Sequence, residues 1–254
     1  MRNATIFIAL SLLLLAGCKK DQTSTVETSQ LGISFTANYD SAPLVMNEGV
    51  YDYNGNAIRF SKVNFYLSDV SLGGTELSEV NFIDITNSHL TEASSREGTN
   101  INFSKIPVDD YPMLAFGIGV SADLNRTKPS DYSTSHPLGS DNSGEYWEAW
   151  DSYIFVKIEG QYDVDGDGFD ADDVPFSYHV GQNEMYRRWM ADFETPISLE
   201  ANTSKNIEFQ IDIKKLLMQE NGELITLSTH DPNNQQEIMR LIMNNFEKAL
   251  RFRI

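Results

Sequence analysis

The stretch Ile207-Glu208-Phe209-Gln210-Ile211-Asp212-Ile213 decides the fold class. Apolar residues occupy every second position, and polar residues fill the positions between them. Successive side chains of a β-strand point to opposite faces, so this pattern predicts a strand with one face in a core and the other in water. It is the cleanest strand pattern in the chain.

The same alternation recurs along the chain and predicts an all-β body. At Ser61-Lys62 and at Ser68-Asp69 two successive residues are polar, so the apolar positions shift by one residue, which predicts bulges or bends. Ile154, Val156 and Ile158 face one way and Tyr153 and Phe155 face the other, and apolar residues on both faces are typical of a central strand. The other predicted strands contain Leu31, Ile33, Phe35, Ala37 and Tyr39; Ile58 and Phe60; Val63, Phe65 and Leu67; Leu114, Phe116, Ile118 and Val120; and Phe176, Tyr178 and Val180.

The end of the chain changes to a helical period. We expect an amphipathic helix there, packed on the β body, with Met239 and Met243 in the core. Two polar stretches, 86–100 and 125–143, are expected to be surface loops. The predicted architecture is a single β-sandwich with a C-terminal helix over residues 31–254. The helical stripe consists of Ile238, Leu241, Ile242, Phe246, Ala249 and Leu250.

The first residues predict export. An apolar run at 6–15 follows Arg2 and is too short for a bilayer, which takes about 20 residues, but it suits a signal peptide. Leu15-Ala16-Gly17-Cys18 resembles the lipobox of bacterial lipoproteins, which implies a signal peptide at 1–17 and a lipid on Cys18. The alternative is an ordinary secreted protein with a free cysteine. Residues 18–30 would form a flexible tether that holds the body in the cell envelope, outside the cytoplasm.

Composition excludes several function classes. A formal net charge of −18 disfavours binding to nucleic-acid phosphates and favours cations as partners. Cys18 is the only cysteine, so the body has no disulfide, no thiolate metal site and no cysteine nucleophile.

A run of acids between two predicted strands predicts a calcium loop. Asp at alternate positions followed by Gly resembles the first half of an EF-hand-type loop, although its twelfth position is Val174 and not Glu. The alternative is a solvated acidic turn, in which the charges would repel one another. The candidate ligands are Asp163, Asp165, Asp167, the Phe169 carbonyl, Asp170, Asp172 and Asp173.

Two histidines and two tryptophans form a second candidate set. His179 falls on the opposite face from Phe176, Tyr178 and Val180, and His136 lies in a long loop upstream of Trp147 and Trp150. Imidazole suits copper or zinc, but on spacing alone the signal is weak, because a lone histidine is more often a surface or hydrogen-bonded core residue and a tryptophan pair more often packs in a core or at its rim.

Six segments in order resemble the MbnP-like copper-binding domain family over nearly the whole body. They are Phe60-Ser-Lys-Val-Asn-Phe-Tyr-Leu-Ser-Asp-Val-Ser-Leu72, Phe116-Gly-Ile-Gly-Val120 with Asn125, His136-Pro-Leu138, Tyr146-Trp147-Glu-Ala-Trp150, Tyr153-Ile-Phe-Val-Lys-Ile-Glu-Gly160 and Phe176-Ser-Tyr-His-Val-Gly181.

The resemblance implies an exported, largely β protein that binds copper. Some members use histidines and a kynurenine, made from a tryptophan by a di-haem partner enzyme of the peroxidase type. His136 and His179 match the family's histidine positions, and Trp147 and Trp150 match its tryptophan motif. Members often have Met where this chain has Glu145, and this difference puts a preference for copper(I) in doubt.

The sequence contains no nucleophile elbow, phosphate-binding loop or dinucleotide fingerprint, so enzyme function is not expected. The leading hypothesis is a membrane-anchored copper-binding lipoprotein. The first rival is an envelope lipoprotein that binds a protein or glycan and holds only structural calcium. The second is a carbohydrate-active enzyme, which would need two acids facing each other across a cleft.

Overall fold

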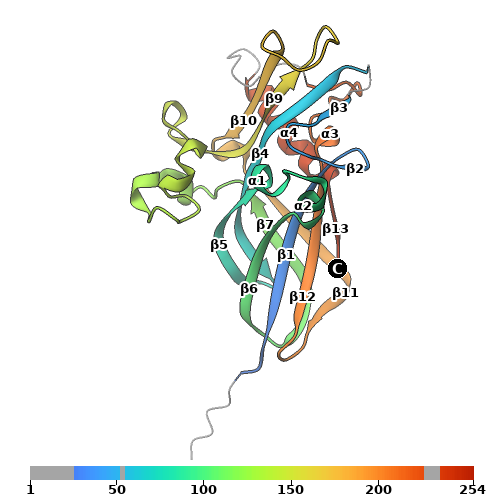
Figure 1. Ribbon diagram of the computed structural model, residues 1–254. Helices are drawn as coiled ribbons and strands as arrows, with labels where there is room; N and C mark the ends of the chain where they lie inside the picture. The colour runs from blue at the N-terminus through green and yellow to red at the C-terminus, as the bar shows by residue number, and fades with distance from the viewer. Residues whose placement is uncertain (1–25, 52–54, 226–234) are drawn as a thin grey trace, which may run out of the picture.

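The computed structural model describes residues 26–51, 55–225 and 235–254 (Figure 1). The predicted signal peptide and Cys18 lie outside the described residues. The strands are β1 (Thr28–Tyr39), β2 (Ala42–Pro43), β3 (Gly49–Tyr51), β4 (Ala57–Leu72), β5 (Thr75–Asp84), β6 (Thr99–Pro107), β7 (Asp109–Ile118), β8 (Tyr146–Trp147), β9 (Ser152–Tyr162), β10 (Val174–Gly181), β11 (Arg187–Leu199), β12 (Ser204–Asp212) and β13 (Leu250–Arg253). The α-helices are α1 (Ile85–Ser88), α2 (Glu92–Glu97), α3 (Ile213–Leu216) and α4 (Gln235–Ala249).

The strands form two sheets that share one core. The smaller sheet has the order β13-β12-β1-β2, with β6 also paired to β1. The larger sheet has the order β10-β9-β4-β7-β11, with β3 and β5 paired to β4 and β8 paired to β9. This arrangement, with a helix near the C-terminus, confirms the predicted all-β, sandwich-like fold.

Strand β4 is the long spine of the larger sheet. Its first half pairs with β9 and its second half with β5 and β7. The register shifts between Phe60 and Lys62 and again between Ser68 and Ser71, which confirms both bulges predicted from parity. At the second bulge Asp69 has φ +53°, a left-handed backbone conformation that interrupts regular pairing.

Residues 207–212 belong to β12, which pairs in parallel with β1. Ile207, Phe209 and Ile211 are buried, as the alternation predicts. Ile213 is also buried, but it begins α3 instead of continuing the strand. The Asp212 side chain accepts a hydrogen bond from the Lys215 N–H and caps this short helix, so a polar strand position also stops the strand.

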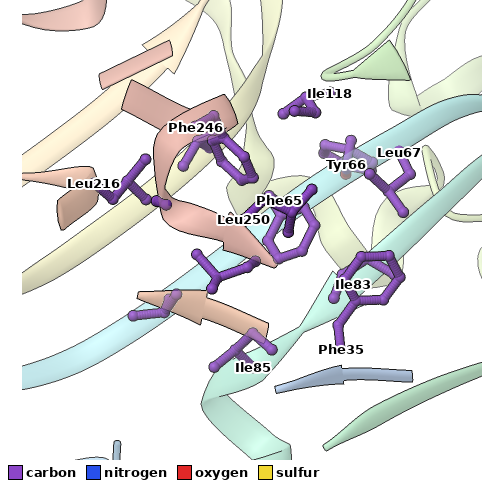
Figure 2. Close-up of a cluster of buried hydrophobic side chains, with 14 of the residues drawn as sticks. Phe35, Phe65, Tyr66, Leu67, Ile83, Ile85, Ile118, Leu216, Phe246 and Leu250 are labelled. Carbon is purple, nitrogen blue, oxygen red and sulfur yellow. The ribbon is translucent and has the colours of Figure 1, made fainter. Parts of the chain in front are cut away.

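Four phenylalanine rings join the two sheets. Phe35 of β1 stacks on Phe209 of β12, with ring centroids 5.1 Å apart. Phe35 also meets the rings of Phe65 from β4 and Phe116 from β7 edge-on, at 5.6 and 6.3 Å. Figure 2 shows Phe35, Phe65 and Phe246 of α4 around the same core, and Phe246 meets Phe65 edge-on at 5.7 Å. Such pairs stabilise a core beyond the area that they bury.

The C-terminal helix is confirmed as α4, and Met239 and Met243 are buried in the core. Leu250, predicted as part of this helix, instead begins β13 on the edge of the smaller sheet. No helix among the described residues is long and apolar enough to cross a membrane.

Two boundaries differ from the prediction. The tether was expected to reach residue 30, but β1 already begins at Thr28, because Gln30 pairs with Ser204 and Ser29 with Ile106. The predicted loop at 86–100 contains α2 and the end of α1. Both are only short helices, stabilised by side-chain caps from Thr91 and Asp84. The loop at 125–143 contains short 3-10 turns.

His89 joins α1 to β1 in the core. Its Nε2 accepts a hydrogen bond from the Ala37 N–H at 2.9 Å, and its Nδ1 lies 2.8 Å from the Ser88 hydroxyl. The side chain is fully buried, and burial lowers the pKa of His89 to about 4. An imidazole that accepts through Nε2 must be neutral, so protonation is incompatible with this packing.

We expect His89 to make stability fall with acid. Below an unfolded-state pKa of about 6.5 the unfolded chain binds a proton that the folded chain excludes, so the free energy of unfolding should drop by about 3 kcal/mol between pH 6.5 and 4. Denaturant unfolding of wild type and His89→Gln across this range isolates the effect from that of the carboxylates. If the free energy of unfolding of His89→Gln fell with acid as steeply as that of wild type, His89 would not be the group responsible.

Candidate metal centre

Strand β10 separates two sets of side chains by its pleat. Phe176, Tyr178 and Val180 are buried in the core, and His179 projects from the opposite face, as predicted, together with Ser177. On the core side, the Tyr178 hydroxyl of β10 donates to the Ile225 carbonyl, and the Tyr162 hydroxyl of β9 donates to the same oxygen at 2.7 Å. These bonds and the pairing of β10 with β9 hold His179 at one position in the sheet.

The imidazole of His179 is oriented by a carboxylate. Its Nε2 lies 2.7 Å from Glu159 Oε1 and 2.9 Å from the Ser177 hydroxyl, and the residue is only 8% exposed. A carboxylate can only accept, so Nε2 carries a proton, and in the neutral imidazole the lone pair is then on Nδ1. The hydrogen bond from His179 holds the pKa of Glu159 below its ordinary value, with help from two nearby lysines and against partial burial.

Two stacked indoles lie against this histidine. The Trp147 ring meets the His179 ring edge-on, with centroids 5.4 Å apart, and Trp150 stacks on Trp147 at 4.6 Å. Trp150 also covers Gly181, where an added Cβ would come within 3.2 Å of the indole and 2.7 Å of the Tyr153 carbonyl. Only glycine fits beneath this ring.

A tight turn brings the tryptophans back onto the sheet. Trp147 in β8 pairs with Ser152 in β9, and between them Asp151 takes a left-handed φ of +48°. The Tyr146 hydroxyl donates to Asp151 at 2.7 Å. Desolvation, together with this carboxylate, raises the pKa of Tyr146, so the phenol stays protonated and keeps the turn closed.

A buried ion pair fixes the chain just before the tryptophans. Lys157 of β9 lies 3.3 Å from Glu145 and donates to the Gly144 carbonyl at 2.7 Å. The side chains are 10% and 6% exposed, respectively. Glu145 Oε2 has this ionic contact but no bond of hydrogen-bond geometry, so Lys157 acts on it as a charge. Glu145, the residue just before the Tyr146-Trp147 pair, thus pairs with a lysine.

His136 lies apart from this group. Its ring stacks on Tyr132 at 4.2 Å, and its Nδ1 accepts from the Leu138 N–H at 3.1 Å. In the described parts of the chain, no ring contact or hydrogen bond joins His136 to His179 or to either tryptophan. The structure therefore groups Trp147, Trp150 and His179 and places His136 in the neighbouring loop. The remaining histidine, His230, lies outside the described residues.

The acidic loop gathers part of its predicted ligand set. Asp163, Asp165 and Asp167 each place an oxygen within 4.8 Å of the others, and no other described residues form such a group of three. A side-chain hydrogen bond with Asp165 raises the pKa of Asp167, and the negative charges of Asp165 and the neighbouring acids add to this effect. The Asp163 carboxylate accepts hydrogen bonds from the Gly166 and Gly168 N–H groups at 2.7 and 3.2 Å, which curls the loop.

The other predicted calcium ligands take different partners. Asp173 accepts from the Asp170 N–H at 2.8 Å, and Asp170 accepts from the Asp172 N–H at 2.7 Å. The Phe169 ring lies under the Arg59 guanidinium, 4.6 Å from its centroid. These residues stabilise the loop locally, outside the group of three.

Sequence reasoning missed Glu159, Ser177 and Lys157 as members of the centre. Lys157 and Glu159 stand two residues apart on a strand whose preceding residues 153–156 are all apolar. Charged residues at that spacing on a central strand indicate a covered polar site. In the pairing of β9 with β10, Lys157 lies opposite His179 and Glu159 lies opposite Ser177.

Comparisons with known proteins address the family. No protein of curated function matches the chain significantly. Among solved structures, MbnP from Methylosinus trichosporium is similar with a TM-score of 0.48 and 17% identity, over 75% of this chain and 78% of that one. A family model described as MbnP matches residues 28–240. Since this match covers most of the chain, the protein belongs to the MbnP family.

Proposed function

We propose that this protein is a lipid-anchored, extracytoplasmic copper-binding protein. The observation that carries the proposal is the geometry at His179, whose Nε2 is tied to Glu159 while the Trp147 ring stands 5.4 Å away. A carboxylate behind a histidine fixes the tautomer and raises its basicity, as at many protein metal sites. The protein would hold its metal and turn over no substrate.

The donor set fits a copper ion. Neutral imidazole is a good copper ligand, and Nδ1 of His179 carries the lone pair. His136 lies apart from His179 in the neighbouring loop, so its loop would have to move for it to supply a second imidazole; it would do so through Nε2, because its Nδ1 accepts from the backbone. Copper held at His179 would serve storage, acquisition or sensing, and the site needs no catalytic acid or base for that role.

An intact indole cannot complete this set, because its N–H only donates. We propose that Trp147 is the tryptophan converted to kynurenine, because its ring contacts His179 directly whereas Trp150 stacks behind it. Two equivalents of hydrogen peroxide, reduced to two waters by a di-haem, peroxidase-like partner enzyme, would take four electrons from the indole. The C2–C3 bond would break, and each of these carbons would gain one oxygen. Hydrolysis would then release the former C2 as formate and expose an aryl amine.

The arrangement of the body suits such a partner. Figure 1 places the Thr28 end of β1 at the opposite end of the body from β9 and β10, which carry Glu159 and His179. An anchor on Cys18 would leave these strands at the end of the body that faces away from the membrane. A partner enzyme outside the cytoplasm could then reach Trp147.

The acidic loop supports calcium as a structural ion. The gathered oxygens of Asp163, Asp165 and Asp167 suit a hard cation. If only calcium bound, the rival function would hold, namely an envelope lipoprotein whose β body binds a protein or glycan. Copper binding at His179 is therefore the measurement that separates the two functions.

Copper titration of the purified protein should show one tight site that depends on His179. We expect His179→Gln to abolish it and Glu159→Gln to weaken it by about 10- to 100-fold, because the carboxylate orients the imidazole. His136→Gln tests the second imidazole in the same assay. Near-ultraviolet circular dichroism checks that each variant is folded. Trp189→Phe is the control variant, because it changes an aromatic residue outside the group of Trp147, Trp150 and His179 and should leave copper binding unchanged. A folded His179→Gln variant with wild-type copper affinity would refute the proposal.

Intact and peptide masses of protein from its native membranes should report two modifications. The mature chain should begin at an acylated Cys18, and Cys18→Ser should release the protein into the soluble fraction. The peptide that contains Trp147 should gain one oxygen and lose one carbon, and deletion of the di-haem partner should prevent this change. An unmodified Trp147 in copper-loaded protein would exclude kynurenine as a ligand at this position.

Calcium should raise the thermal unfolding temperature, since an ion that binds only the folded state stabilises it by mass action. Asp165→Asn combined with Asp167→Asn should remove this effect, whereas Asp172→Asn, outside the group of three, should retain most of it. Differential scanning calorimetry with calcium or chelator measures the shift. An equal shift in all variants would place the ion elsewhere.

A further inference from the structure

A separate pocket at the smaller sheet is lined by residues of α2, β1, β12 and β13. The places of these elements in the fold can be followed in Figure 1. It has a volume of about 420 Å³, the size of a small-molecule site. None of the residues of the candidate metal centre lines it. The residues used below are Thr36, Asn38, Gln210, Arg251, Arg253 and Arg96.

The strand register sets the polar groups side by side. Thr36 of β1 pairs with Gln210 of β12, and Gln210 pairs with Arg251 of β13. One row across the sheet therefore presents a hydroxyl, an amide and a guanidinium. In the next row Glu208 pairs with Arg253 and neutralises it through an ion pair.

Asn38 supplies an amide at the wall of the pocket. The residue is only 9% exposed, but its side-chain amide is not among the buried unpaired polar atoms of the described residues, so the amide still reaches the solvent that fills the pocket. An amide that faces a pocket in this way offers both a donor and an acceptor to a polar ligand there.

The charge of the pocket is opposite to that of the protein. Three arginines and one glutamate line it, although the chain carries a net charge of −18. Arg96 is paired with Glu92 at 2.6 Å, and Arg253 with Glu208. Arg251 has no acidic partner among the described residues. Its Nη1 donates to the carbonyls of Lys248 and Leu250 at 2.9 and 2.8 Å, which fixes the guanidinium without neutralising it.

We propose that this pocket binds a small organic anion. A carboxylate or phosphate group of the ligand pairs with Arg251, whose planar guanidinium matches the geometry of an oxyanion. The polar body of the ligand bonds to the amides of Asn38 and Gln210. This pocket shares no residue with the candidate metal centre, so a negative result for anion binding would not bear on copper binding, and the reverse also holds.

The test uses three probes on the folded protein, namely glucuronate, inorganic phosphate and neutral glucose. In side-chain amide spectra, glucuronate or phosphate should saturate and shift the Asn38 and Gln210 resonances, and glucose should not. Arg251→Gln should weaken binding by about tenfold or more, because it removes a charge-assisted hydrogen bond. Asn38→Ala should weaken it as well.

Arg126→Gln is the matched control, because it removes one positive charge from an exposed pair with Asp123 outside the pocket. It should bind the anions like wild type. Equal weakening by Arg126→Gln and Arg251→Gln would mean that bulk charge alone acts, and would overturn the proposal. Binding of glucose as tightly as glucuronate, or no binding of either anion, would overturn it too.

Discussion

The fold depends on apolar contact between two sheets, because no covalent link can hold them together. Cys18 is the only cysteine, and it lies before the first strand, so a disulfide within the body is impossible. Phe35 and Phe209 from one sheet interlock with Phe65 and Phe116 from the other. Dispersion between close-packed rings and the removal of apolar surface from water thus supply most of the stabilisation.

The candidate metal centre depends on the alternation of side chains between the two faces of β10. Each residue of β10 that points into this core obliges its neighbour to point outward, and His179 and Ser177 are those neighbours. The outward face would be ordinary solvated surface if nothing covered it. The Trp147 segment covers it, and Lys157 holds that segment down through a buried ion pair, whose loss of one partner would leave a costly lone charge. Rigid strands therefore orient the histidine, and a clamped loop supplies the indoles.

The periodicity of apolar residues predicted those features of the fold that depend on burial along a single strand or helix. The strands around Ile207 and Tyr153, both bulges in β4 and the buried methionines of α4 could be foreseen, because burial leaves a period of two or 3.6 residues in the sequence. The start of α3 at Ile213 and of β13 at Leu250 could not, because side-chain capping and pairing with a distant strand override the pattern there. The meeting of Trp147 with His179 was predicted only through family resemblance. The part played by Glu159 and Lys157 depends on cross-strand register, which a single sequence does not encode visibly.

The place of β1 in the smaller sheet has a mechanical consequence. This strand is paired along most of its length with β12 on one side and β6 on the other. A pull on the chain before Thr28, as from the proposed anchor, would run along the strand axis and load many backbone hydrogen bonds at once. Such shear loading resists extraction far better than the one-by-one opening of an edge strand. The strand nearest the anchor is therefore also the one best placed to bear tension from a moving membrane.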